Sequence, residues 1–233
     1  MIQMANQPKT LSTAGAAYGK IASFYDVFLT ITCFKRGIEN FLERLKLELP
    51  PRPRILDAGC GTGLVARYLA RRYPDAEIYA SDIDIKMLLE MERIIKREGI
   101  ERERFIIAEG DLASPEKMRN TKNGEVIKIP EGYFDAIIVS AALEHVSLNQ
   151  TLFALKRILK PSGTFLNIGM RDNPAGAILS MMYHCRPYQI SEMRRACERV
   201  GFGDIRLLRL KADDFPANLS RIAIIAKRPE SKK

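Results

Sequence analysis

The sequence has no tryptophan, only two histidines and only four cysteines in 233 residues. Cys33, Cys60, Cys185 and Cys197 lie at none of the spacings that metal ligands adopt, and two histidines are too few to complete a zinc site with them. A chain of this length also has no need of disulfide bonds to hold its core. We therefore expect neither a metal site nor a disulfide framework.

Long apolar runs are missing as well. The segment "AIIVSAAL", residues 136–143, is typical of the longest ones and falls far short of the roughly 20 residues that a helix needs to cross a bilayer. The amino-terminal segment contains no continuous apolar stretch of the kind found in secretory signals. The sequence thus predicts a cytoplasmic protein without a membrane span.

Acidic residues are fewer than basic ones: 28 Asp and Glu stand against 37 Lys and Arg, a net charge of +9. Such an excess is found in proteins that bind nucleic acid or a membrane surface. The basic residues, however, recur in every predicted helix, mostly among acidic neighbours, and we favour a solvated surface over a nucleic-acid patch. They include Arg67, Arg71, Arg72, Arg93, Lys96, Arg97, Lys156, Arg157, Lys160, Arg194, Arg195 and Arg199.

The chain divides near residue 50. Residues 1–50 are rich in aromatic side chains and include "IENFLERLKLEL", residues 38–49, whose apolar positions have helical spacing. The segment "PPRP" then interrupts the chain. We expect residues 1–50 to form a helical extension, or lid, on one main domain, residues 51–233.

Short apolar runs alternate with amphipathic stretches throughout the main domain, which is the pattern of parallel strands joined by helices. Ser147 and Gln150 have the spacing of a capping box at the start of one such helix. The predicted strands are residues 54–59, 77–82, 104–111, 134–142, 164–169, 204–210 and 221–227.

Two connections are longer than the few residues usual between such elements. In residues 112–132, Asn123 and Gly124 mark a turn, as in a small hairpin. Residues 173–187 are unusually apolar for a connection. The sequence does not reveal the role of either segment.

The stretch "LDAGCGTG", residues 56–63, joins the first predicted strand to a helix and places bare backbone N–H groups at the start of that helix. Its glycines are Gly59, Gly61 and Gly63. Leu64 occupies the place of the third glycine of a dinucleotide-binding loop, so that loop is disfavoured. No lysine followed by serine or threonine closes the turn, which excludes the phosphate loop of nucleoside triphosphatases.

"LDAGCGTG" instead resembles the first motif of the class I S-adenosylmethionine-dependent methyltransferases. The resemblance continues in "SDID", "EGD" and "IPEGYFDAIIVSAALEHV", and "YGKIASFYD" is similar to the lead-in of the ubiquinone and menaquinone biosynthesis type. It covers roughly residues 18–227. The family implies an α/β, Rossmann-like fold: a seven-stranded, mostly parallel sheet with an antiparallel last strand, helices on both faces and a helical amino-terminal extension.

The resemblance also implies a site for S-adenosylmethionine, released as S-adenosylhomocysteine. The three glycines would lie beneath the methionine part, Asp57 would position that loop or the amino group, and Asp82 would accept hydrogen bonds from both ribose hydroxyls. Tyr18 and Tyr25 either cap the cofactor or pack the extension onto the core. The remaining implied contacts are Ile83 packing on the adenine, Asp111 and the Leu112 backbone at its amino group, and Ser140 near the sulfonium.

Methyl transfer is a direct displacement for which a dedicated base is optional. Glu144 and His145 follow the fourth strand, where the acceptor should arrive, and either could accept its proton; alternatively both only pair or cap at the next helix. His184 is a weaker candidate. The apolar character of 1–50 and 173–187 favours a small apolar or amphipathic acceptor. An RNA or protein acceptor, or a catalytically silent cofactor-binding regulator, remains the alternative, and the oligomeric state is open.

Overall fold

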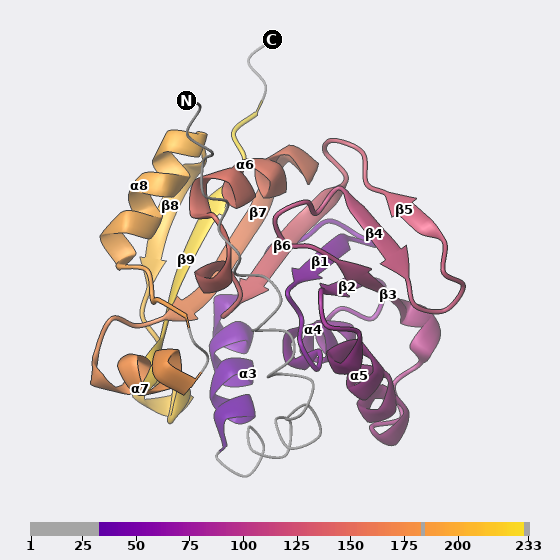
Figure 1. Ribbon diagram of the computed structural model, residues 1–233, viewed down its shortest axis with the longest axis horizontal. Helices are drawn as coiled ribbons and strands as arrows, with labels where there is room; N and C mark the ends of the chain where they lie inside the picture. The colour runs from indigo at the N-terminus through magenta and orange to yellow at the C-terminus, as the bar shows by residue number, and fades with distance from the viewer. Residues whose placement is uncertain (1–32, 183–184, 231–233) are drawn as a thin grey trace, which may run out of the picture.

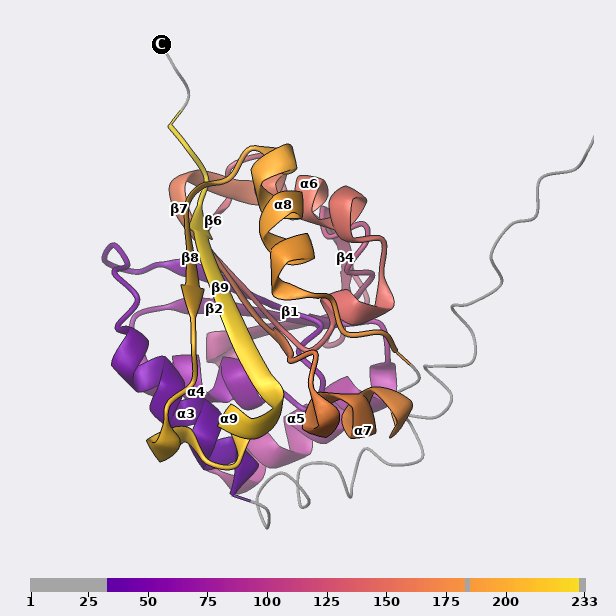
Figure 2. The same ribbon diagram turned by 90° about the vertical axis from the view of Figure 1, so that its left-hand side faces the viewer.

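The computed structural model describes residues 33–182 and 185–230, which form one sheet with helices on both faces (Figure 1, Figure 2). The described strands lie in the order β5-β4-β3-β2-β1-β6-β7-β9-β8. From β3 to β7 the neighbours are parallel, whereas β9 is antiparallel to β7 and β8. Their bounds are β1 Arg54–Ala58, β2 Glu77–Asp82, β3 Phe105–Gly110, β4 Lys117–Asn120, β5 Val126–Lys128, β6 Phe134–Ser140, β7 Leu159–Met170, β8 Gly203–Leu208 and β9 Arg221–Lys227.

The seven predicted strands form the part of the sheet from β3 to β8, with an antiparallel last strand, which confirms the predicted fold class. The described sheet has nine strands, however, not seven. The additional β4 and β5 come from residues 112–132 and form a hairpin on the edge of β3. Asn123 and Gly124 lie in its turn, where Gly124 has a φ of 72°. Strands of four and three residues are too short to show an alternating pattern in the sequence.

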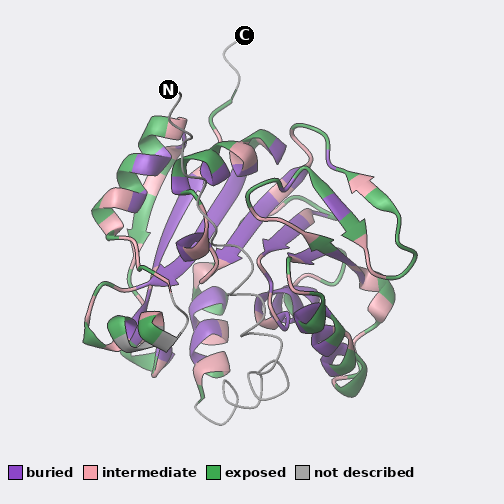
Figure 3. Ribbon diagram, in the orientation of Figure 1, coloured by how far each residue is buried: buried purple, intermediate pink, exposed green. Residues whose placement is uncertain are grey.

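The central strands β1, β2, β6, β7 and β9 are mostly buried, as Figure 3 shows in purple, and they have helices on both faces. Ile55 packs with α3, α4 and α5 on one face, and its neighbour Leu56 packs with α6 and α8 on the other. Within the described ranges, no helix is long and apolar enough to cross a membrane. The helices are α3 Phe34–Leu45, α4 Leu64–Arg72, α5 Ile85–Arg97, α6 Leu148–Ile158, α7 Pro174–Met182, α8 Ile190–Val200 and α9 Ala217–Ser220, with short 3-10 turns η1 Arg102–Arg104, η2 Leu143–His145 and η3 Ala212–Asp214.

Arg67 does not belong to the solvated surface, so that part of the charge prediction is wrong. Its side chain is fully buried on α4, where it donates to the carboxylate of Glu98 and, at 3.2 Å, to the carbonyl of Gly63. Lys35 and Arg71 also bond Glu98, at 2.9 and 3.0 Å. Burial raises the pKa of Glu98, but the Lys35 hydrogen bond and the arginine charges outweigh it and lower that pKa below its ordinary value. One carboxylate therefore joins α3, α4 and the end of α5.

Helix α3 is the described part of the predicted extension, and it is fixed to the carboxyl-terminal half of the chain. Arg44 forms an ion pair with the buried Asp214 of η3. Gly37 lies so close to η3 that a Cβ atom there would overlap the carbonyl oxygen of Asp214. The division at residue 50 stays a prediction, because residues 1–32 lie outside the described chain.

The predicted capping box at α6 is not formed. Ser147 precedes the helix, but its side chain makes no capping hydrogen bond, and only its carbonyl oxygen accepts from Thr151 N–H, at 3.0 Å. Ser147 is exposed, so water competes for its hydroxyl group. The helix nevertheless begins at the predicted place because Leu148, Leu152 and Leu155 bury one apolar face.

Candidate functional site

The glycine-rich loop follows β1 at the carboxyl edge of the sheet and leads into α4. Gly59, Gly61 and Gly63 have φ angles of 70°, 55° and 77°, a backbone conformation that residues with a Cβ atom rarely adopt. The N–H groups of Gly59 and Cys60 donate to the Ser81 carbonyl oxygen at 2.8 and 2.9 Å. The loop is therefore held against the end of β2.

The three glycines face different surroundings. A Cβ at Gly59 would overlap the Cβ of Ala142, and one at Gly63 would overlap the side chain of Met91 on α5. At Gly61, apart from its two chain neighbours, no atom of the described residues lies within 4 Å of the Cβ position. Gly59 and Gly63 thus permit close packing, whereas Gly61 presents bare backbone to open space, where a ligand can approach it.

Asp57 lies at the end of β1, beneath the loop, and is fully buried. Its Oδ2 accepts from Ala66 N–H at 2.9 Å, so it fixes the first turn of α4 against β1. Its Oδ1 has no hydrogen-bond partner in the described chain, nor has the hydroxyl of the buried Thr62. Burial raises the pKa of Asp57 to about 7; the Ala66 hydrogen bond opposes this shift, and the nearby charge of Asp82 adds to it.

Asp82 ends β2 and bonds two backbone segments at once. Its Oδ2 accepts from Gly61 N–H at 2.7 Å and its Oδ1 from Asp84 N–H at 2.9 Å. Burial raises the pKa of Asp82, and these hydrogen bonds oppose the shift. Each carboxylate oxygen keeps a second lone pair that a hydroxyl can use. Ile83, beside it, is 52% exposed and offers apolar surface at the same edge.

The loop after β3 also lies against the glycine-rich loop. Leu112 has a methyl group 3.9 Å from the Cβ position of Gly59. Asp111 is half-buried, and its Oδ1 accepts from Ala113 N–H at 2.8 Å, which fixes the turn. The structure thus brings the ends of β1, β2, β3 and, through Ala142, β6 together, as the predicted site requires.

The chain turns sharply after Ser140, the last residue of β6. Ala141 has a φ of 52°, a strained conformation for a residue with a side chain, and its N–H donates to Ile168 at 3.0 Å. This turn places Ala142 on Gly59 and sends η2 across the end of β7. Backbone strain of this kind is concentrated at functional sites.

Glu144 and His145 form η2, separate from the next helix. Glu144 is 9% exposed, and its Oε1 accepts from the N–H of Met170 at 2.7 Å. Its Oε2 has no hydrogen-bond partner in the described residues. Burial lowers the pKa of His145, against the charge of Glu144, which favours the neutral imidazole at neutral pH. One carboxylate oxygen of Glu144 thus holds η2 against the end of β7, and the other can accept a hydrogen bond or a proton from a ligand.

Sequence reasoning missed Asn167 on β7 and Arg221 at the start of β9. Both are 4% exposed, and Oδ1 of Asn167 and Nη1 of Arg221 lack hydrogen-bond partners among the described residues. Two features of the sequence could have indicated them: a polar residue within the apolar strand "TFLNIG" and an arginine at the start of the apolar strand "RIAIIAK". Tyr18, Tyr25 and His184 lie outside the described residues.

Residues 55–163 match the family described as "Methyltransferase domain". The chain is 27% identical over 211 residues to demethylmenaquinone methyltransferase of Thermus thermophilus, a match that covers 90% of this chain and 89% of the relative.

Two solved structures share the fold. Geranyl diphosphate C-methyltransferase from Streptomyces coelicolor, in complex with Mg²⁺, geranyl diphosphate and S-adenosyl-L-homocysteine, superposes with a TM-score of 0.63 at 15% identity, over 82% of this chain and 78% of that one. A putative O-methyltransferase from Nostoc punctiforme superposes with a TM-score of 0.69 at 19% identity, over 95% of this chain and 63% of that one. At these identities the likeness concerns the fold alone.

Proposed function

Because the chain is a class I S-adenosylmethionine-dependent methyltransferase, we propose that its acceptor is a small apolar or amphipathic molecule of the quinone-precursor kind. The relative that supports this proposal is named for demethylmenaquinone, and its match spans most of both chains. The apolar residues 173–187 also suit such an acceptor. An RNA or protein acceptor and a silent regulator are not favoured, since the curated relative is named as an enzyme for a small molecule. The cytoplasmic location stays a prediction.

The observation that supports the cofactor site is the bare backbone of Gly61, which no other described residue crowds, beside the Asp82 carboxylate. S-adenosylmethionine, when bound, supplies a methyl group on a sulfonium, a good electrophile. The unpartnered Oδ1 of Asp57 and hydroxyl of Thr62 fit its polar amino-acid part. In the proposed arrangement Asp82 holds the ribose, Ile83 and Leu112 border the adenine, Asp111 lies near its amino group, Ser140 borders the sulfonium, and Gly59, Gly61 and Gly63 lie beneath the amino-acid part.

The protein's main contribution to the reaction is to hold the acceptor in line with the methyl group. Positioning of this kind can lower the free-energy barrier of the reaction by roughly 7 to 11 kcal/mol. As the acceptor's bond to the methyl group forms, the carbon–sulfur bond breaks and the acceptor loses a proton. Glu144 and His145 are the proposed acceptors of that proton, and the position of η2 beside the end of β7 supports this role.

The proposal is tested with the wild-type protein by isothermal titration and by a methyl-transfer assay. We expect S-adenosylhomocysteine to bind and NAD not to bind. With methyl-labelled S-adenosylmethionine, label should pass to reduced 1,4-naphthoquinone and not to total RNA. Binding of NAD in place of S-adenosylhomocysteine would refute the cofactor assignment, and label in RNA alone would refute the acceptor class.

The pH dependence of cofactor binding tests the role of Asp57. If its Oδ1 faces the ligand's ammonium group, binding favours the ionised carboxylate, so the ligand lowers a pKa that is about 7 in the free protein. Affinity for S-adenosylhomocysteine should then rise about tenfold between pH 5.5 and 6.5, with release of a proton on binding. In the free protein the same raised pKa makes the free energy of unfolding fall as the pH rises through about 7.

Asp57→Asn is the matched control for that pH series. Its amide oxygen can still accept from Ala66 N–H, so the start of α4 is preserved while the titrating group is removed. We expect its affinity to be lower at pH 7.5 and nearly constant over the pH range. A wild-type titration as flat as that of Asp57→Asn would show that Asp57 only positions the loop.

A further inference from the structure

Two buried charged side chains flank the carboxyl end of β7 and have no charged partner in the described chain. Arg221, on β9, is 4% exposed, and its Nη1 has no hydrogen-bond partner there. Glu144 is 9% exposed, and the same holds for its Oε2. No ion pair within the described ranges involves either residue. The guanidinium group of Arg221 instead lies 5.2 Å from the ring centre of Phe34 on α3.

Burial of two charged side chains without partners costs free energy unless a ligand supplies the missing hydrogen bonds. Removing a charged group from water costs several kcal/mol, and an arginine cannot avoid this cost by losing its proton. The contact with the Phe34 ring stabilises the positive charge but gives the N–H groups no acceptor. An anionic or strongly accepting oxygen in the site would supply what Arg221 lacks.

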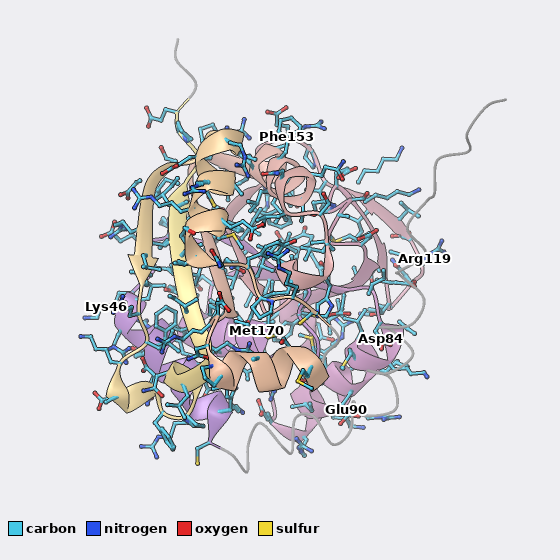
Figure 4. The ribbon with its side chains drawn as sticks, turned by 60° about the vertical axis from the view of Figure 1, so that its left-hand side comes forward. Lys46, Asp84, Glu90, Arg119, Phe153 and Met170 are labelled. Atoms are coloured by element: carbon cyan, nitrogen blue, oxygen red, sulfur yellow. The ribbon has the colours of Figure 1, made fainter. Side chains whose placement is uncertain are left out.

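Both side chains border the same residue, Met170, which Figure 4 labels just before α7. Strand register places Arg221 directly opposite Met170, and Glu144 accepts the N–H of Met170. Cys185, beyond α7, lies within range of both charges: burial raises the pKa of its thiol to about 11, Glu144 adds to this shift and Arg221 opposes it. The two groups therefore belong to one end of the sheet, the end at which the acceptor should arrive.

We propose that Arg221 and Glu144 bind the hydroxyl group of a phenolic or enolic methyl acceptor. Nη1 of Arg221 donates to the acceptor oxygen, and Oε2 of Glu144 accepts its hydrogen. Transfer of that proton to Oε2 leaves the acceptor as an oxyanion held by Arg221 and the glutamate as a neutral acid. The ring or enol carbon then attacks the methyl group as the carbon–sulfur bond breaks and S-adenosylhomocysteine leaves. The methylated carbon of the resulting ketone loses its hydrogen to solvent as a proton, and the Glu144 acid returns its proton to the oxygen, which restores the hydroxyl group and the carboxylate. The inference rests on the proposed function and specifies its substrate class as hydroxylated.

The test measures binding of 1-naphthol and of 1-methoxynaphthalene in the presence of saturating S-adenosylhomocysteine. Wild-type protein should bind 1-naphthol at least about 30-fold more tightly than the methyl ether, which cannot donate a hydrogen. Arg221→Met should remove about 30-fold of the affinity for 1-naphthol and leave that for the ether unchanged. Arg221→Lys, which keeps the charge but not the planar fork, should lose about fivefold.

Arg171→Met is the matched control, because Arg171 follows β7 but already donates to the Asn218 carbonyl, at 3.0 Å. The Arg171→Met protein should bind 1-naphthol as tightly as the wild type does. S-adenosylhomocysteine affinity reports folding in each variant, and Arg221→Lys decides the outcome if Arg221→Met does not fold. Equal naphthol binding by wild type and folded Arg221 variants would overturn the inference. So would Arg221-dependent binding of 1-naphthoate without binding of 1-naphthol. Failure of the wild type to bind S-adenosylhomocysteine would refute the underlying function instead.

Discussion

Asp82→Ala is expected to weaken the binding of S-adenosylhomocysteine at least about 100-fold, because one carboxylate has two functions. In the proposed arrangement it accepts hydrogen bonds from both ribose hydroxyls, and in the structure it also accepts from Gly61 N–H and Asp84 N–H. Hydrogen bonds to a charged group contribute about 1.5 to 3 kcal/mol each. Loss of two such bonds, together with release of the loop at Gly61, gives the expected effect. Isothermal titration measures it.

Asp84→Ala is the control for this experiment. Asp84 is two residues further along the chain, and its Oδ1 caps α5 by accepting from Lys86 N–H at 2.9 Å. Its removal should cost about 1 kcal/mol of stability and leave ligand affinity within about threefold. An Asp82→Ala protein that melts like Asp84→Ala and binds the ligand like the wild type would contradict the assignment of the ribose site.

The sequence allowed the main sheet and the convergence of its loops to be predicted because both depend on local patterns. Apolar runs define the buried strands, and a parallel strand order brings their carboxyl ends together, so residues placed at those ends meet. Gly59, Leu112 and Ala142 confirm this convergence in atomic detail. The family resemblance supplied the antiparallel direction of the last strand, which the local patterns alone do not specify.

The features that were missed depend on tertiary contacts between distant segments. Arg67 resembles a surface residue in the helix pattern, but it is buried because the partly buried Glu98, 31 positions later, forms an ion pair with it. Arg221 and Glu144 come to the same place only through the register of β9 against β7 and the η2 turn. A single sequence gives neither register nor the direction of a side chain after a strained residue such as Ala141.

Glu144→Gln is expected to reduce kcat for methyl transfer to reduced 1,4-naphthoquinone by roughly 100-fold, while affinity for S-adenosylhomocysteine is retained. The substitution separates the two oxygens of the side chain. The amide oxygen can still accept from Met170 N–H, so the anchor between η2 and β7 remains. The other oxygen becomes an NH₂ group, which cannot take a proton from the acceptor. Initial rates at saturating cofactor, with thermal melting as the check of folding, measure the effect.

The comparison with Glu144→Ala and His145→Gln makes the assignment specific. Glu144→Ala leaves the buried Met170 N–H without its partner, so it should also lower stability, by about 1 to 3 kcal/mol. His145→Gln should reduce kcat by less than tenfold if Glu144 is the base. A hundredfold loss in His145→Gln, with near wild-type kcat in Glu144→Gln, would transfer the role to the imidazole. Glu144 would then only anchor the turn, because an amide serves that purpose as well as a carboxylate does.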